Sequence, residues 1–261
     1  MSADFTSDEI MTVSAARMLR NGAICFVGIG LPSTAANLAR LLHAPDAVLI
    51  YESGPIGAKP AVLPLSIGDG SLAETADTVV STPEIFRYWL QGGRVDVGFL
   101  GAAQLDRFAN INTTVIGDYR KPKVRLPGAG GAPEISTSAK EVLVIAKQSR
   151  RSFVEKLDFI TSAGFLTGAD ARERAGIPGR GPVAVITDLC ILRPDAKTRE
   201  LIVTGIHPGI SRDRICANTG WEIRFSEDCG ATEAPAENEL KALRDLLART
   251  AKAHGTAGVA A

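Results

Sequence analysis

The sequence has 261 residues, of which 45% are hydrophobic and 22% are charged, as is ordinary for a soluble globular protein. Lysine plus arginine equals aspartate plus glutamate at 29 each, so the chain lacks the overall positive charge that favours binding to nucleic acid or to an anionic membrane. The length fits one large α/β domain or two small ones, and we expect no nucleic acid and no membrane among the partners.

The spacing of the cysteines and the N-terminal residues bear on metal binding and on the cellular location of the protein. No two cysteines have a CxxC spacing, so neither a zinc site nor a redox motif is indicated; they are Cys25, Cys190, Cys216 and Cys229. The N-terminus lacks a basic segment followed by an apolar one, and no apolar run reaches the roughly 18 residues of a membrane-spanning helix. We therefore expect a cytoplasmic protein that has no signal peptide and binds no metal.

The first part of the chain follows a strand–helix–strand order. Apolar residues at helical spacing predict a helix over residues 8–20. Short apolar runs predict buried strands at 23–27 and 47–51, and a helix at 33–42 connects them. Such an order predicts two parallel strands joined by a right-handed crossover.

The later elements continue this pattern with long loops between them. We predict strands at 78–80, 95–100, 141–146, 183–192 and 200–206, and helices at 82–91, 211–218 and 234–254. Residues 1–261 are thus expected to form one α/β domain with an open, mostly parallel sheet flanked by helices. Its late region, 151–182, is loop-rich, and the chain closes with the C-terminal helix at 234–254.

Glu52 follows the predicted strand 47–51 directly, and Ser53 and Gly54 come after it. It therefore stands at the carboxyl end of a parallel strand, where open α/β sheets bind their ligands. A carboxylate in this place can act as a nucleophile, a general base or a metal ligand. It can equally cap a turn or pair with a lysine, and position alone leaves both interpretations open.

A glycine-rich loop is the second candidate. It runs from Leu126 to Ala132 and contains Gly128, Ala129, Gly130 and Gly131. Glycines let backbone N–H groups approach a ligand closely, so the loop is suited to an oxyanion hole or a phosphate-binding nest. A plain flexible turn is the alternative, because glycine clusters are common in loops.

The loop after the first predicted strand contains Gly28-Ile29-Gly30. A strand–GxG–helix order begins the dinucleotide-binding fingerprint, although the third glycine position is Ser33 here. Glu52 lies at the spacing of the acidic residue in that fingerprint, so a nucleotide-binding module is one alternative. We also take Gly28, Gly30, Ser53 and Gly54 as candidates for lining a substrate pocket.

Amide side chains follow the predicted strand 95–100. Gln104, Asn110 and Asn112 can hydrogen-bond a carbonyl or a carboxylate, and we take them as further candidates for the substrate pocket. Asparagine side chains also form turns with their own backbone, which is the alternative for Asn110 in particular.

Taken together, three blocks of sequence resemble a known family. They are Ile50-Tyr51-Glu52-Ser53-Gly54, the run from Gly98 to Thr114, and Pro127 to Ala132. This combination resembles the B subunit of class I CoA-transferases, in the group of the glutaconate and 3-oxoadipate enzymes, over nearly the whole chain. The resemblance implies the CoA-transferase (NagB/RpiA-like) fold. One departure is Ala109, where the family usually has glycine.

The resemblance also implies an activity for each of the main segments. Glu52 would be the nucleophile that moves CoA from succinyl-CoA to a dicarboxylic 3-oxo acid, such as 3-oxoadipate, through a glutamyl-CoA thioester, in the degradation of aromatic compounds. The loop Gly128–Gly131 would supply N–H groups to the oxyanions and contact CoA. The CoA thioester would be a substrate, with no permanently bound cofactor.

A companion A subunit, in a heterodimer or a larger heteromer, would complete the pocket, so the chain alone is expected to be inactive. We see no obvious basic cluster for the phosphates of CoA in the sequence. Three alternatives stay open: a glutaconate-type CoA-transferase, a CoA-thioester hydrolase or ring-opening enzyme of the same fold, and a non-catalytic partner subunit.

Overall fold

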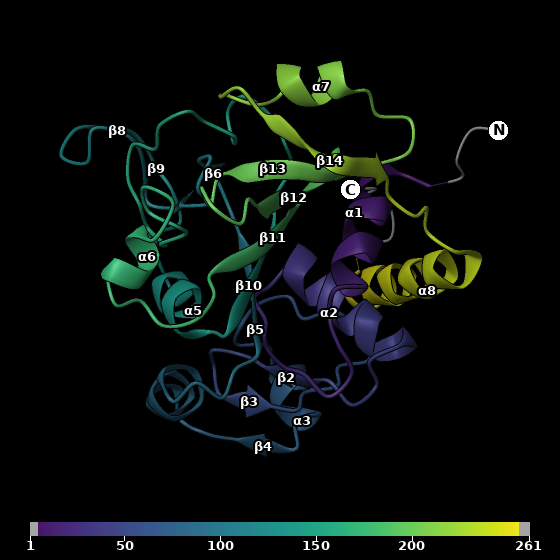
Figure 1. Ribbon diagram of the computed structural model, residues 1–261. Coiled ribbons are helices and arrows are strands. Elements are labelled where there is room, and N and C mark those ends of the chain that lie inside the picture. Colours follow the sequence, from purple (N-terminus) through teal and green to yellow (C-terminus); the bar gives the residue numbers. More distant parts are fainter. Residues whose placement is uncertain (1–4, 256–261) are drawn as a thin grey trace.

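A single ten-stranded sheet organises the chain in the computed structural model, which describes residues 5–255 (Figure 1). Residues 1–4, which bear on the expected absence of a signal peptide, and residues 256–261 lie outside the described part. In spatial order the strands are β14 (Arg224–Ala231), β13 (Leu201–Ile206), β12 (Cys190–Pro194), β11 (Pro182–Ile186), β10 (Glu141–Ile145), β5 (Val97–Gly101), β1 (Ile24–Phe26), β2 (Val48–Ile50), β3 (Pro55–Ile56) and β4 (Thr78–Val79).

The five central strands, β11, β10, β5, β1 and β2, all run parallel. The antiparallel pairs lie toward the two edges of the sheet. This arrangement confirms the expected open, mostly parallel α/β sheet. Two small hairpins lie outside it, formed by β6 (Gln104–Leu105) with β7 (Ile111–Asn112) and by β8 (Val115–Gly117) with β9 (Pro122–Arg125).

Helices cover both faces of the sheet. On one face α1 (Ser7–Ala16), α2 (Leu31–Leu42) and α8 (Glu237–Ala253) pack against one another. On the other face the π-helix η1 (Ile85–Gln91) packs against α5 (Ala132–Ser138), which contacts β5. The remaining helices are short: α3 (Gly70–Glu74), α4 (Thr82–Glu84), α6 (Ala171–Arg174) and α7 (Arg212–Ala217). Within residues 5–255, every helix is too short or too polar to span a bilayer.

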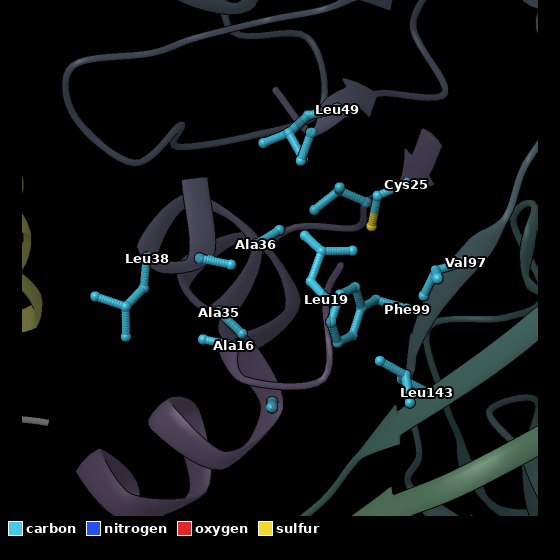
Figure 2. Packing of buried hydrophobic residues seen from close by; sticks show 14 of the residues in the cluster. Ala16, Leu19, Cys25, Ala35, Ala36, Leu38, Leu49, Val97, Phe99 and Leu143 are labelled. Atoms are coloured by element: carbon cyan, nitrogen blue, oxygen red, sulfur yellow. The ribbon is translucent and has the colours of Figure 1, made fainter. Parts of the chain in front are cut away.

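Because both faces are covered, alternate residues of one strand enter different cores. Cys25 and Leu49 belong to the cluster under α1 and α2, which Figure 2 shows with Phe99 and Leu143 pointing toward the helices. Their neighbour Phe26 belongs to the second cluster, under η1 and α5. Burial on both faces explains why the central strands are continuous apolar runs in the sequence.

The predicted strand at 183–192 is wrong, because it is two antiparallel strands. The chain reverses at Thr187, whose hydroxyl oxygen accepts the N–H groups of Leu189 (3.0 Å) and Cys190 (2.9 Å). A hydroxyl that caps its own turn replaces the glycine or proline that usually marks one. His207 secures this turn, since its Nε2 donates to the Thr187 carbonyl at 2.9 Å.

One other prediction needs correction, and one strand was not predicted. The expected helix at 82–91 is one short turn, α4, followed by the π-helix η1. The sequence does not predict a strand at the position of β14, which carries polar residues because it forms an exposed edge of the sheet. The C-terminal helix is confirmed as α8.

Arg172 holds together the loop-rich region around 151–182. Its side chain is only 2% exposed, and burial lowers the pKa of its guanidinium. The guanidinium donates to six backbone carbonyls, those of Ser136, Thr137, Ala163, Gly164, Pro178 and Gly179. One side chain thus ties the end of α5 to two loops for which the sequence predicts no regular structure.

We predict that Arg172→Lys lowers the free energy of unfolding by about 3 kcal/mol. The compact ammonium of lysine cannot replace the planar guanidinium of Arg172, so buried carbonyls lose their donors. Urea unfolding followed by circular dichroism measures this. Arg174→Lys is the matched control: it lies on the same helix, with an exposed side chain, and is expected to change stability by less than about 0.5 kcal/mol. Equal effects of the two substitutions would contradict the role of Arg172.

Candidate active site

Glu52 lies in a tight turn between β2 and β3. The turn closes because the Gly54 N–H donates to the Tyr51 carbonyl and the Tyr51 N–H donates to the Pro55 carbonyl, both at 3.0 Å. Successive side chains of a strand point to opposite faces. Tyr51 is fully buried in the cluster under α2, and Glu52 is half-buried and turns toward the face that η1 and α5 cover.

Gly54 has a structural reason to be glycine. Its φ is 121°, and a Cβ there would lie 2.1 Å from the carbonyl oxygen of Val80. The Val80 N–H in turn donates to the Gly54 carbonyl at 3.1 Å, which fixes the turn against β4. Gly54 therefore shapes the turn that presents Glu52, whereas Ser53 is exposed beside it.

The Glu52 carboxylate lies against the backbone of Gly131, the residue that precedes α5. A Cβ placed on Gly131 would be 3.0 Å from Glu52 Oε2 and 2.8 Å from Phe86 Cζ. No side chain fits in this space. Phe86 comes from η1, and its ring centroid lies 6.1 Å from that of Phe26 at the end of β1. The structure thus brings the glycine-rich loop to Glu52, as the sequence predicts, and adds an aromatic ring.

Three backbone N–H groups of this loop have no acceptor within residues 5–255. They belong to Ala129, Gly130 and Gly131, of which the first two are exposed. The loop itself is anchored, because the Gly128 N–H donates to the Thr113 carbonyl at 2.8 Å and the Thr113 hydroxyl donates to the Gly128 carbonyl at 2.7 Å. Fixed N–H donors beside a carboxylate are suited to stabilise an oxyanion that forms when the carboxylate attacks a carbonyl.

Gly28 and Gly30 follow β1, so they lie, like Glu52 after β2, at the carboxyl ends of the parallel strands. Strand β1 ends beside β2, where the Val27 N–H donates to the Ile50 carbonyl at 2.9 Å. A Cβ on either glycine would meet no atom within 4 Å, so the loop before α2 leaves open space. Both glycines keep their place as candidates for a substrate pocket.

Gln104 and Asn112 are buried and bonded to each other, with Asn112 Nδ2 donating to Gln104 Oε1 at 2.8 Å. Asn112 also donates to the Val115 carbonyl, and its Oδ1 accepts the N–H groups of Thr114 and Val115. The Asn112 amide is therefore fully used within the protein, and Gln104 contributes its Oε1 to the same network. They support the segment that anchors the glycine-rich loop.

Asn110 is also fully buried and serves the backbone. Its Nδ2 donates to Asp106 Oδ2 and to the Leu166 carbonyl, and its Oδ1 accepts N–H groups of Gly164 and Leu166. Burial raises the pKa of the Asp106 carboxyl. Ala109 has a φ of 56°, in the left-handed region that favours glycine, which is the physical reason for a glycine at this position in the family that the sequence resembles.

Phe86 is the functional candidate that sequence reasoning missed. It lies in a segment with ordinary helical signals, which the structure shows as a π-helix with the Phe86 ring beside Gly131. The available signal was the run of bulky residues from Ile85 to Trp89 before two glycines. In the described part of the chain, no group of His, Cys, Asp and Glu residues is placed to hold a metal ion.

Comparisons with known proteins identify the family of the chain. The family described as coenzyme A transferase matches residues 9–218. The chain is 71% identical to the B subunit of 3-oxoadipate CoA-transferase from Pseudomonas knackmussii, over 99% of both chains. It is 35% identical to the B subunit of glutaconate CoA-transferase from Acidaminococcus fermentans, over 94% of this chain and 93% of that one.

The fold is similar to a solved structure as well. The crystal structure of glutaconate coenzyme A-transferase from Acidaminococcus fermentans superimposes with a TM-score of 0.86 at 33% identity. The match covers 93% of this chain and 94% of that chain. The sequence match, the relatives and the shared fold lead to one conclusion. The chain belongs to the coenzyme A transferase family.

Proposed function

We propose that this chain is the nucleophile-bearing subunit of a CoA-transferase that moves CoA from succinyl-CoA to 3-oxoadipate, in the degradation of aromatic compounds. The observation that carries the proposal is the Glu52 carboxylate at the sheet edge, in contact with Gly131 beside N–H groups that have no acceptor within residues 5–255. The 71% identity to the B subunit of a 3-oxoadipate CoA-transferase supports the choice of acceptor. A glutaconate-type acceptor is the second candidate, supported by the 35% identical relative.

The proposed reaction begins when a Glu52 oxygen attacks the thioester carbonyl of succinyl-CoA. The carbon–sulfur bond breaks, CoA leaves as a thiolate, and an acyl-glutamyl anhydride remains on the enzyme. The thiolate then attacks the glutamyl carbonyl of the anhydride, so that succinate leaves and a glutamyl-CoA thioester forms. The acceptor carboxylate repeats these steps in reverse and departs as its CoA thioester, which regenerates the Glu52 carboxylate.

Each attack places negative charge on a carbonyl oxygen. The N–H groups of Ala129, Gly130 and Gly131 are the donors that this chain offers to that charge. The Phe86 ring beside Gly131 excludes water from one side of the carboxylate, which strengthens these interactions and protects the anhydride from hydrolysis.

We further propose that an A subunit completes the site, since the relatives include proteins named as B subunits. Glu52 is only half-buried in this chain and Ser53 beside it is exposed, which leaves room for a second chain to enclose the substrates. The CoA thioester is a substrate here and not a resident cofactor.

Glu52→Gln is expected to lower transferase activity by on the order of 10³-fold or more, because an amide cannot form the anhydride. Borohydride reduction of the assembled enzyme after incubation with succinyl-CoA should place a reduced residue at position 52 in peptide mass mapping. The control Glu222→Gln, at an exposed glutamate, should keep full activity and the modification.

An unmodified Glu52 in a fully active enzyme would refute the proposed nucleophile. Turnover that needs water but no acceptor acid, and that survives Glu52→Ala, would instead identify a thioester hydrolase or ring-opening enzyme. Full activity of the Glu52→Gln complex would identify a non-catalytic partner subunit.

Gly131→Ala should lower kcat by about 100-fold, because the new Cβ would lie within 3.0 Å of both Glu52 Oε2 and the Phe86 ring and must displace one of them. Steady-state kinetics measures the effect, with unfolding curves as a check on the fold. Gly70→Ala is the control, since a Cβ there meets nothing within 4 Å. Wild-type kcat in Gly131→Ala would show that this close contact does not matter.

The isolated chain is expected to have no measurable transferase activity, and adding the purified A subunit should restore it. Succinyl-CoA consumption, followed in the presence of 3-oxoadipate and then of glutaconate, measures both the restoration and the preferred acceptor. Activity of the chain by itself would contradict the shared site.

A further inference from the structure

The β8–β9 hairpin carries four basic residues within six positions, Arg120, Lys121, Lys123 and Arg125. No basic cluster for the phosphates of CoA is obvious from the sequence, and this hairpin is a candidate for one. The net charge of the whole chain is zero and so does not indicate this cluster. The structure shows that its residues share one small hairpin. Figure 1 shows this hairpin at the outer edge of the molecule, on the same side as α5.

We infer that this hairpin binds the phosphate groups of the CoA substrate. The inference rests on the proposed function. It assigns a site to the phosphate groups of CoA, for which the residues around Glu52 provide no partner. CoA carries its phosphates at one end of an extended pantetheine chain and its reacting sulfur at the other. Its phosphate site must therefore be basic, exposed to the substrate and well separated from Glu52, yet fixed relative to it.

The hairpin has a net positive charge, because residues 115–125 hold four basic residues and one acidic residue, Asp118. Arg120, Lys121 and Lys123 are exposed, and within residues 5–255 none of them forms a salt bridge. The nearby carboxylates serve the backbone, since Asp118 accepts the N–H groups of Arg120 and Lys121, and Asp158 accepts that of Gly117. The hairpin therefore offers a positive surface that is free to pair with phosphates.

An aromatic surface accompanies these charges. Tyr119 is 53% exposed, and its ring stacks on that of Phe159 with centroids 5.4 Å apart. The Arg125 guanidinium lies 4.9 Å from the Tyr119 ring centroid and donates to the Tyr119 carbonyl at 2.9 Å. An exposed ring next to ordered cations suits an adenine base that carries phosphates, because bases stack on aromatic side chains.

A short connection, anchored by hydrogen bonds, joins the hairpin to the glycine-rich loop. From Arg125 the chain reaches Gly131 in six residues, which span at most about 20 Å when extended. The Leu126 N–H donates to the Thr114 carbonyl at 3.0 Å, and Gly128 exchanges hydrogen bonds with Thr113. Phosphates held on the hairpin would thus hold the thioester end of the same molecule within reach of Glu52.

The test uses two acyl donors and two variants that lose the same charge. The hairpin variant carries Arg120→Gln, Lys121→Gln and Lys123→Gln, and leaves Arg125 in place to preserve the contact with Tyr119. The control variant carries Lys241→Gln, Arg249→Gln and Lys252→Gln, all exposed on α8. The donors are succinyl-CoA and succinyl-pantetheine, which lacks every phosphate, and both are assayed with the complete enzyme.

With succinyl-CoA, we expect the hairpin variant to lose at least about tenfold in kcat/KM, since a hydrogen bond to a charged group contributes roughly that factor. With succinyl-pantetheine it should equal the wild type. The control variant should match the wild type with both donors. Added salt should reduce the wild-type preference for succinyl-CoA, because it screens exposed charges.

Three results would overturn the inference. The hairpin variant could keep the wild-type preference for succinyl-CoA, it could lose activity equally with both donors, or it could fail to assemble with the A subunit in size-exclusion chromatography, which would make the hairpin a docking surface for that subunit. Failure of the proposed function itself is distinguishable, because borohydride trapping at Glu52 would then be missing in the wild type as well.

Discussion

The close approach of the Glu52 carboxylate to the backbone of Gly131 is the contact on which the rest of the site depends. A missing Cβ makes it possible, since any side chain at Gly131 would collide with the carboxylate or with Phe86. Four segments must be in place for it: the end of β2, the turn fixed by Gly54, the start of α5 and the π-helix. The parallel pairing of β1, β2 and β5 brings their carboxyl ends to one edge of the sheet and so makes the contact geometrically possible.

The buried side-chain amides of Gln104 and Asn112 explain how the glycine-rich loop is held in place. Gln104 and Asn112 bond to each other, Asn112 also bonds backbone groups, and the next residue, Thr113, anchors Gly128. Such support fixes N–H donors before the substrate arrives, which is the condition for stabilising an oxyanion without reorganisation. Ala109 fits the same account, because a strained residue persists where surrounding hydrogen bonds determine its conformation.

The sequence predicts the central sheet well for a physical reason. Strands buried on both faces are continuous apolar runs, and Glu52 stands out because a charged residue ends one of them. Features set by tertiary contacts were not predictable. Thr187 turns the chain without glycine or proline, η1 is a π-helix in a segment that carries ordinary helical signals, and β14 is polar because it lies at an edge.

The same limit applies to the site. Residue type identified Gln104, Asn110 and Asn112 as polar candidates, but only the structure shows that Asn110 and Asn112 are fully buried and hydrogen-bond backbone groups. The basic residues of the hairpin are close together in the sequence, but the structure shows that they share one hairpin, which the hydrogen bonds of Thr113 and Thr114 anchor beside the glycine-rich loop.

The contact between Glu52 and Gly131 also bears on the order in which the protein becomes active. The two residues are far apart along the chain, and strands β3 to β9 separate them. During synthesis, Glu52 leaves the ribosome long before the glycine-rich loop, so an incomplete chain holds the carboxylate without its N–H donors. A chain that ends before the glycine-rich loop therefore lacks part of the site proposed to react with thioesters.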